Sequence, residues 1–81
     1  MNYNGWENEE TYQARLYLQN DYELYTKALE FKERSIDSEV LSYYLRDLIR
    51  MRIREDKKMS EYIGNVDKVD FKEIARAFYD N

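Results

Sequence analysis

Apolar residues along this chain of 81 residues recur with the 3.6-residue period of an α-helix, and no stretch sustains the period-two alternation of a strand. The sequence contains no proline and only two glycines, Gly5 and Gly64, so it offers few turns between strands. The pattern predicts an all-α fold, a compact single-domain bundle of four main helices with a possible short fifth. After an N-terminal arm over residues 1–7, the expected helices cover residues 9–19, 21–34, 38–55, 57–63 and 70–79.

Helix start signals support these boundaries. Asn8 is a good N-cap for the first helix, and the acidic residues that follow it suit the positive end of the helix dipole. Asn20 followed three residues later by Glu23 is typical of a capping box, and so is Asp70 followed by Glu73.

The third helix presents an apolar stripe that includes Leu45 and Leu48. Continued without a break, this stripe would bring Arg52 to the middle of the apolar face, and a buried arginine needs a carboxylate partner. We therefore expect the helix to fray or bend near residues 54–56, and a short further helix to end at Gly64 as its C-cap. The apolar faces together predict one core that contains Tyr12, Leu16, Leu18, Leu45, Leu48, Ile74 and Phe78.

Two segments carry distinctive motifs, NGWENEETYQARLYLQND over residues 4–21 and VDFKEIA over residues 69–75. They resemble the opening and closing motifs of a small-protein family found mainly in phages, plasmids and bacterial mobile regions, which read NGWxNxETWxxxLWLxND and VDWxEIA. In this chain Tyr12 and Tyr17 stand where the family favours tryptophan, and Phe71 replaces another. The family has no assigned biochemical activity, so the resemblance implies an origin on a mobile genetic element and supplies no catalytic residues.

Trp6, the only tryptophan, lies just before the cap of the first helix. Because the resemblance links this tryptophan to a helix start and to the last helix, it looks like part of a packing signature. We expect the indole to pack back onto Tyr12 in a variant of the hydrophobic staple, and not to wait exposed for a partner.

The composition argues against catalysis. The chain has no histidine and no cysteine, which removes the usual base near neutral pH, the thiol nucleophile and the commonest zinc ligands. No glycine-rich phosphate loop accompanies its carboxylates, so we expect no enzyme, no catalytic or metal-binding residue and no cofactor. The apolar runs are short and the N-terminus lacks the pattern of a signal peptide, so we expect no membrane partner and a cytoplasmic location, in the host if the protein is viral.

Acidic residues dominate the net charge of −4 and gather near the start of the chain. Residues 1–33 carry seven acidic and three basic residues, whereas residues 34–58 carry five acidic and seven basic ones. Because clustered carboxylates attract a basic cleft, we interpret the chain as a non-enzymatic protein-interaction module from a mobile element. The sharpest form of this hypothesis is an inhibitor that occludes a host nuclease or defence complex, as an anti-CRISPR or anti-restriction protein does. The candidate partner-binding acids are Glu7, Glu9, Glu10, Asp21 and Glu23.

A basic stripe on the third helix favours an alternative function. Arginines recur there every four residues and so share one side of the helix. Basic side chains beside an aromatic ring can contact phosphates and stack on a base, which is the chemistry of a small nucleic-acid-binding or regulatory accessory protein. A solvated helix face diluted by acidic neighbours explains the same pattern without a function, and a structural subunit that works only as a homo-oligomer is a third reading. The candidate anion-binding residues are Tyr43, Arg46, Arg50, Arg54 and Lys57.

Overall fold

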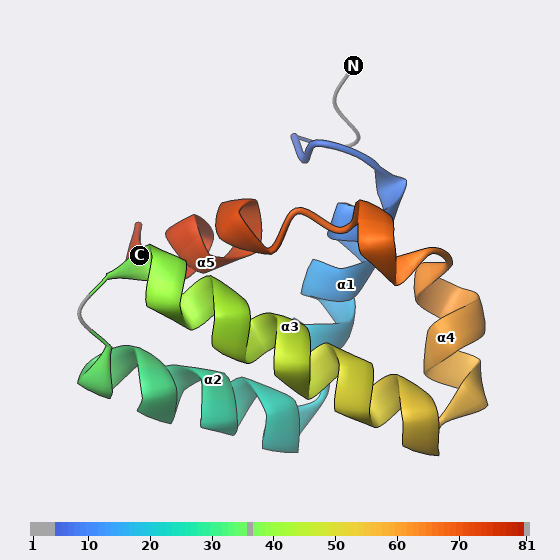
Figure 1. Ribbon diagram of the computed structural model, residues 1–81, viewed down its shortest axis with the longest axis horizontal. Helices are drawn as coiled ribbons and strands as arrows, with labels where there is room; N and C mark the ends of the chain where they lie inside the picture. The colour runs from blue at the N-terminus through green and yellow to red at the C-terminus, as the bar shows by residue number, and fades with distance from the viewer. Residues whose placement is uncertain (1–4, 36, 81) are drawn as a thin grey trace.

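The computed structural model describes residues 5–35 and 37–80, which form five α-helices and one short 3₁₀ helix (Figure 1). No strand occurs among these described residues, so the all-α prediction is confirmed. Positions 1–4, 36 and 81 lie outside the described residues, and with them the first part of the predicted N-terminal arm. The elements are α1 (Glu9–Asn20), α2 (Tyr22–Arg34), α3 (Ser38–Glu55), α4 (Lys57–Ile63), η1 (Val66–Lys68) and α5 (Phe71–Tyr79).

The observed boundaries differ from the predicted ones mainly at the junction of α1 and α2. Asn20, predicted as the cap of the second helix, is the last residue of α1, and the cap is Asp21. The helix α3 does end before position 56, and Gly64 ends α4, with its backbone N–H donating to the carbonyl of Ser60 at 2.9 Å. The element η1 has no counterpart in the prediction.

Asparagine or aspartate side chains begin all five α-helices. Each side-chain oxygen accepts a hydrogen bond of 2.8 to 3.1 Å from a backbone N–H in the first turn, and so satisfies one of the donors that a helix start leaves without a partner. A single residue in extended conformation separates α1 from α2, and another separates α3 from α4. These residues, Asp21 and Asp56, form the corner between two helices and also cap the second helix. The caps are Asn8, Asp21, Asp37, Asp56 and Asp70.

The helix α3 is the main packing partner of its neighbours. It runs antiparallel to α2 along one side, packs against α5 along the other, and meets α4 at its C-terminal end (Figure 1). The helix α1 lies on the far side of this layer in the view and packs against α2, α4 and α5. The molecule therefore measures 31 × 31 × 19 Å, a flattened shape with two broad faces.

The hydrophobic core differs from the predicted set on α1 and α3. Tyr12 and Leu16 are only half-buried, and so is Leu48, whereas Ile49 is fully buried. Several apolar residues flank each helix face, and the pattern alone could not decide which of them points inward. The buried apolar residues are Ala14, Leu18, Leu24, Ala28, Leu41, Leu45, Ile49, Met59, Ile63, Val69, Phe71, Ile74, Ala75 and Phe78.

The segment before α1 is fixed to the body of the fold. Trp6 is half-buried and packs against the core, with the guanidinium of Arg15 lying 6.0 Å from the indole and 5.5 Å from the ring of Phe78. The indole is thus docked on the body of the fold beside Arg15, whereas its predicted packing onto Tyr12 stays a prediction. The cap of α1 and a residue of its first turn also hold the segment before α5. Asn8 Nδ2 donates to Lys68 O, and the N–H of Asp70 donates to Thr11 Oγ1, both at 2.8 Å.

Candidate interaction surfaces

The five acids predicted to bind a partner do not form one surface. Glu9 and Glu10 lie in the first turn of α1, whereas Asp21 follows its last residue and Glu23 lies beyond it. A helix of twelve residues is about 18 Å long, so the two groups lie at opposite ends of α1.

An arginine from α3 neutralises the second group. Arg52 donates to Asp21 at 2.5 Å and to Glu23 at 2.7 Å, which joins α3 to the corner between α1 and α2. The side chains of Arg52 and Asp21 are only 20% and 21% exposed, and that of Glu23 is 64% exposed. Asp21 therefore serves the fold as a cap and an ion-pair partner, and little of it remains for an external ligand.

A second bond holds the other corner. The hydroxyl of Tyr17, in α1, donates to Asp56 at 3.1 Å, and Asp56 is the corner between α3 and α4. Burial raises the pKa of the Tyr17 hydroxyl, and the hydrogen bond to Asp56 raises it further. For Asp21, burial opposes ionisation, but the backbone N–H of Leu24 and the guanidinium of Arg52 stabilise the carboxylate, so its pKa lies below the usual value. The two corner aspartates are thus linked to neighbouring helices through this network.

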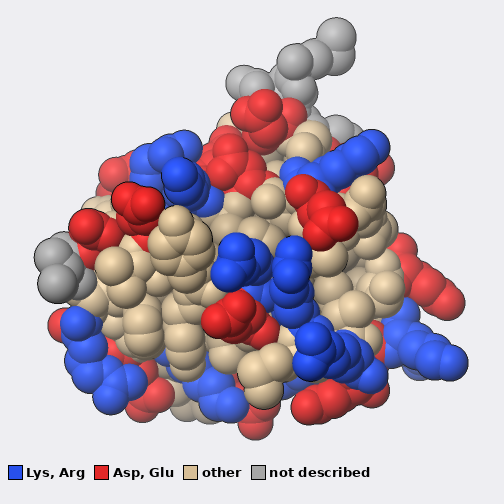
Figure 2. Space-filling model, in the orientation of Figure 1, with Lys and Arg blue, Asp and Glu red and all other residues tan. Residues whose placement is uncertain are grey.

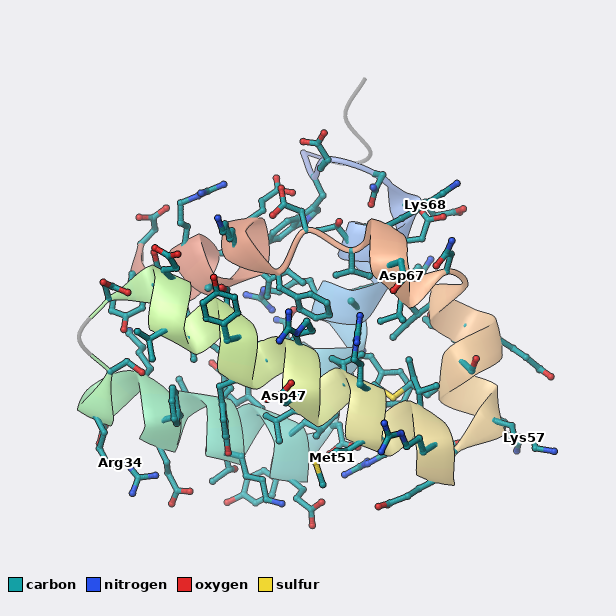
Figure 3. The ribbon with its side chains drawn as sticks, in the orientation of Figure 1. Arg34, Asp47, Met51, Lys57, Asp67 and Lys68 are labelled. Atoms are coloured by element: carbon teal, nitrogen blue, oxygen red, sulfur yellow. The ribbon has the colours of Figure 1, made fainter. Side chains whose placement is uncertain are left out.

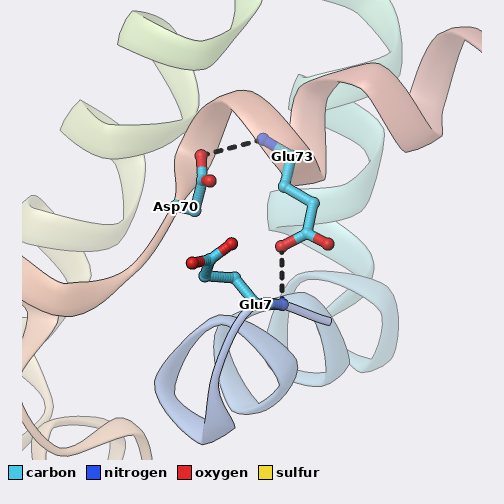
Figure 4. A group of neighbouring side chains, drawn as sticks. All are labelled: Glu7, Asp70 and Glu73. Atoms are coloured by element: carbon cyan, nitrogen blue, oxygen red, sulfur yellow. Dashed lines mark hydrogen bonds between the residues drawn. The ribbon is translucent and has the colours of Figure 1, made fainter. Parts of the chain in front are cut away.

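Two acids at the start of α5, its cap Asp70 and Glu73 of its first turn, lie beside Glu7. The side chains of Glu7, Asp70 and Glu73 converge, and an oxygen atom of each lies within 4.8 Å of the others (Figure 4). The backbone N–H of Glu7 donates to Glu73 Oε1 at 2.9 Å, and Asp70 Oδ1 caps α5 by accepting from the N–H of Glu73 at 3.1 Å. The predicted capping box is therefore only half formed, because the Glu73 carboxylate binds the segment before α1. We call the set of Glu7, Glu9, Glu10, Asp70 and Glu73 the acidic end.

The predicted basic stripe lies on the broad face that α3 occupies. Figure 2 shows lysine and arginine side chains gathered over the middle of this face. The side chains of Arg46 and Arg50 are 43% and 49% exposed, and each lies near an acid: Arg46 Nε is 3.8 Å from Asp47, and Arg50 donates to Asp67 at 3.2 Å (Figure 3). Lys57, which was expected to flank the stripe, lies on α4 and projects away from α3 in the same figure.

A shallow pocket of about 240 Å³ separates the N-terminal half of α3 from the start of α5. Ser42, Tyr43 and Arg46 line it from α3, and the other side is formed by Val69, Asp70, Phe71 and Lys72. The guanidinium of Arg46 lies 5.4 Å from the centre of the Tyr43 ring. Tyr43 and Arg46, two residues predicted to bind anions, thus share a pocket with Lys72, which lies 26 positions after Arg46 in the chain.

A comparison with known protein families identifies the family of this chain. The family described as a family of unknown function, DUF7249, matches residues 1–80. The chain belongs to this family. No curated protein and no solved structure matches it. Membership of DUF7249 assigns no activity, and the predicted origin on a mobile element stays a prediction.

Sequence reasoning missed the residues of this DUF7249 chain that only the fold brings together. The capping signal located Asp70 and Glu73, but nothing local indicated that they meet Glu7 across the fold. Lys72 and Phe71 were likewise outside the predicted anion-binding set, although they line the same pocket as Arg46. Among the described residues, no helix is both long and apolar enough to cross a bilayer.

Proposed function

We propose that the protein is a non-enzymatic interaction module that uses its acidic end to cover a basic surface on a protein partner. The observation that carries this proposal is the convergence of Glu7, Asp70 and Glu73, whose oxygen atoms lie within 4.8 Å of one another. Glu9 and Glu10 belong to the first turn of α1, whose cap Asn8 and residue Thr11 are bonded to the segment that leads into α5.

The electrostatics of the acidic end favour an external cation. Two unit charges about 5 Å apart repel each other by about 1 kcal/mol even at the dielectric constant of water. Within the described part of the chain, no lysine or arginine forms a salt bridge with any of these five acids. A basic partner would relieve the repulsion, and the attraction would act mainly on the rate of association and weaken with salt.

The sharpest form of the proposal names the class of partner. A protein that binds nucleic acid presents a groove of lysines and arginines, and an acidic end can occupy that groove in place of phosphates. A host nuclease or defence complex is such a partner, and an anti-CRISPR or anti-restriction role by occlusion fits an origin on a mobile element. The site of action would then be the host cytoplasm.

Affinity capture with a charge-matched control tests this proposal. The variant Glu9→Lys/Glu10→Lys reverses two charges of the acidic end, and Glu30→Lys/Glu33→Lys reverses two exposed charges on α2. Tagged proteins are used to capture partners from host lysate, and the bound proteins are identified by mass spectrometry. We expect the first variant to lose at least tenfold in the captured partner, and the second to retain it.

Circular dichroism and thermal melting check that both variants fold, because reversing acids in a first turn costs about 0.3–1 kcal/mol each. Equal losses in both variants would reduce the effect to net charge, and no loss in the first variant would remove the acidic end from the interface.

A further inference from the structure

The pocket between α3 and the start of α5 combines three features that point to one ligand chemistry. Arg46 and Lys72 bring positive charge from two separate elements. Tyr43 is 49% exposed, and its hydroxyl donates to Glu39 at 3.4 Å, so a half-exposed ring forms part of the wall. Phe71 contributes an apolar surface that is only 9% exposed.

The cationic groups of this pocket are available to a ligand. The side chain of Arg46 is 43% exposed, and its distance of 3.8 Å from Asp47 is too long for a hydrogen bond. Lys72 is exposed. Asp70 also lines the pocket, but its Oδ1 atom is engaged by the N–H of Glu73.

The positive charge continues beyond the pocket. Arg50 and Arg54 follow Arg46 at intervals of four residues, so the row extends about 12 Å along α3. Arg50 pairs with Asp67, but both side chains are well exposed, and an exposed ion pair is weak enough for a phosphate to replace the carboxylate. The row can therefore meet more than one phosphate of an extended strand.

We propose that this pocket binds one nucleotide of a single-stranded nucleic acid. A phosphate lies between Arg46 and Lys72, the unpaired base packs against Tyr43, and neighbouring phosphates of the strand meet Arg50 and Arg54. Aromatic rings stack on unpaired bases, whereas the bases of a duplex are already stacked and paired, so the site favours a single strand. This pocket shares Asp70 with the acidic end used in the proposed function, but the binding of a strand at Tyr43, Arg46 and Lys72 does not depend on that function.

Fluorescence anisotropy with a labelled 12-nucleotide single strand of mixed sequence tests the proposal, in DNA and in RNA, between 50 and 200 mM salt. The duplex of the same sequence and the free mononucleotide are the competitors. We expect the single strand to bind at low salt, more tightly than either competitor. Four phosphate contacts predict that log K falls with log salt with a slope of about −2 to −3.

Three variants locate the contacts. Tyr43→Leu keeps an apolar side chain and removes the ring, and should weaken binding about tenfold, because stacking contributes about 1–3 kcal/mol per base. Lys72→Gln should weaken binding and reduce the salt slope by about 0.7. Lys27→Gln changes the net charge equally at an exposed position on α2 and should leave both affinity and slope unchanged.

Several results would overturn the proposal. They are no binding of either single strand at 50 mM salt, equal binding of the duplex or of the free mononucleotide, equal losses in Lys72→Gln and Lys27→Gln, or unchanged affinity in Tyr43→Leu. Each variant is first shown to have the circular dichroism spectrum of the parent protein. Capture of a protein partner through the acidic end is a separate measurement, so failure of one proposal leaves the other standing.

Discussion

Replacing Arg52 with methionine tests whether an ion pair holds the helix corners in place. Arg52 joins α3 to Asp21 and Glu23 at the junction of α1 and α2. Methionine keeps an unbranched apolar side chain but removes the guanidinium. Any decrease in the free energy of unfolding therefore comes mainly from the lost charge and its hydrogen bonds. The matched control is Arg54→Met, which removes an exposed arginine from the same helix end.

The expected loss lies between two limits. An exposed ion pair is worth about 0–1 kcal/mol, and removing one partner of a fully buried pair costs about 3–5 kcal/mol. Because the side chains of Arg52 and Asp21 are 20% and 21% exposed, we expect Arg52→Met to lower the free energy of unfolding by about 2–3 kcal/mol. A chain of 81 residues has a total of about 4–12 kcal/mol, so this loss is large, whereas the loss in Arg54→Met should stay below about 0.5 kcal/mol.

A double-mutant cycle followed by urea unfolding isolates the pair. Asp21→Asn removes the charge and keeps a side-chain oxygen that can accept from the N–H of Leu24, so the cap survives. Arg52 retains Glu23 as a partner in that variant, so we expect a coupling energy between Arg52 and Asp21 of about 1–2 kcal/mol. A coupling energy below about 0.5 kcal/mol would refute the stabilising role of this ion pair. The loss of stability in each single variant would then come from changed packing.

The pH dependence gives an independent check. The folded state lowers the pKa of Asp21 below its unfolded value of 3.8, so this stabilisation is fully present above that pH and is lost as the pH falls through the folded pKa. The difference in stability between the parent protein and Asp21→Asn should therefore shrink below pH 3.8. An unchanged difference at acidic pH would exclude the carboxylate charge as its cause.

Four further outcomes follow from the packing and the hydrogen bonds. Ile49→Ala should cost about 2–5 kcal/mol by urea unfolding and Leu48→Ala clearly less, because only Ile49 is fully buried. Gly64→Ala should cost about 1–3 kcal/mol in the same assay, because φ is +87° and ψ is −130° there, a conformation that residues with a Cβ rarely adopt. Tyr17→Phe should cost about 1 kcal/mol near neutral pH, and the raised pKa of Tyr17 means that this difference is lost as the pH rises above 10 through the folded pKa. The emission of Trp6 should be only moderately blue-shifted and should move to longer wavelength on unfolding, whereas an unfolded-like emission in the folded protein would contradict the docked indole.

Local chemistry explains why the helices could be predicted so closely. The start of α3 and both ends of α4 depend on short-range signals, a capping aspartate or a terminal glycine, that act within one turn. The error at Asn20 has the same origin, because Asn20 and Asp21 are both good caps and adjacent. Glu23 three residues after Asn20 favoured the wrong one, although its carboxylate binds Arg52.

The inward faces were harder to predict, because they depend on neighbours that the sequence does not place. Leu48 and Ile49 are adjacent and both apolar, and only the arrangement of the helices around α3 decides that Ile49 is covered completely. The surroundings of Arg52, a charged residue on the inner face, also depend on residues far away in the sequence. Its position on the inner face predicted that the helix would end near residues 54–56, and α3 does end at Glu55. The partners of Arg52 could not be predicted, because they are acids 29 and 31 residues away.

The acids show most clearly why a surface cannot be read from clustering along a chain. Helix starts select carboxylates for local reasons, so an all-α protein with capped helices carries acids at many positions whether or not it binds anything. What separates them is the cation that each one meets after folding. Asp21 forms an ion pair with Arg52 inside the molecule. Glu7 and Glu73 lie beside each other and Asp70, and none of these three acids forms a salt bridge with a described lysine or arginine. Carboxylates brought together without an internal cation are the ones for which an external cation changes the energy most, and for that reason the acidic end, and not the acid-rich first third of the sequence, is where a partner should be sought.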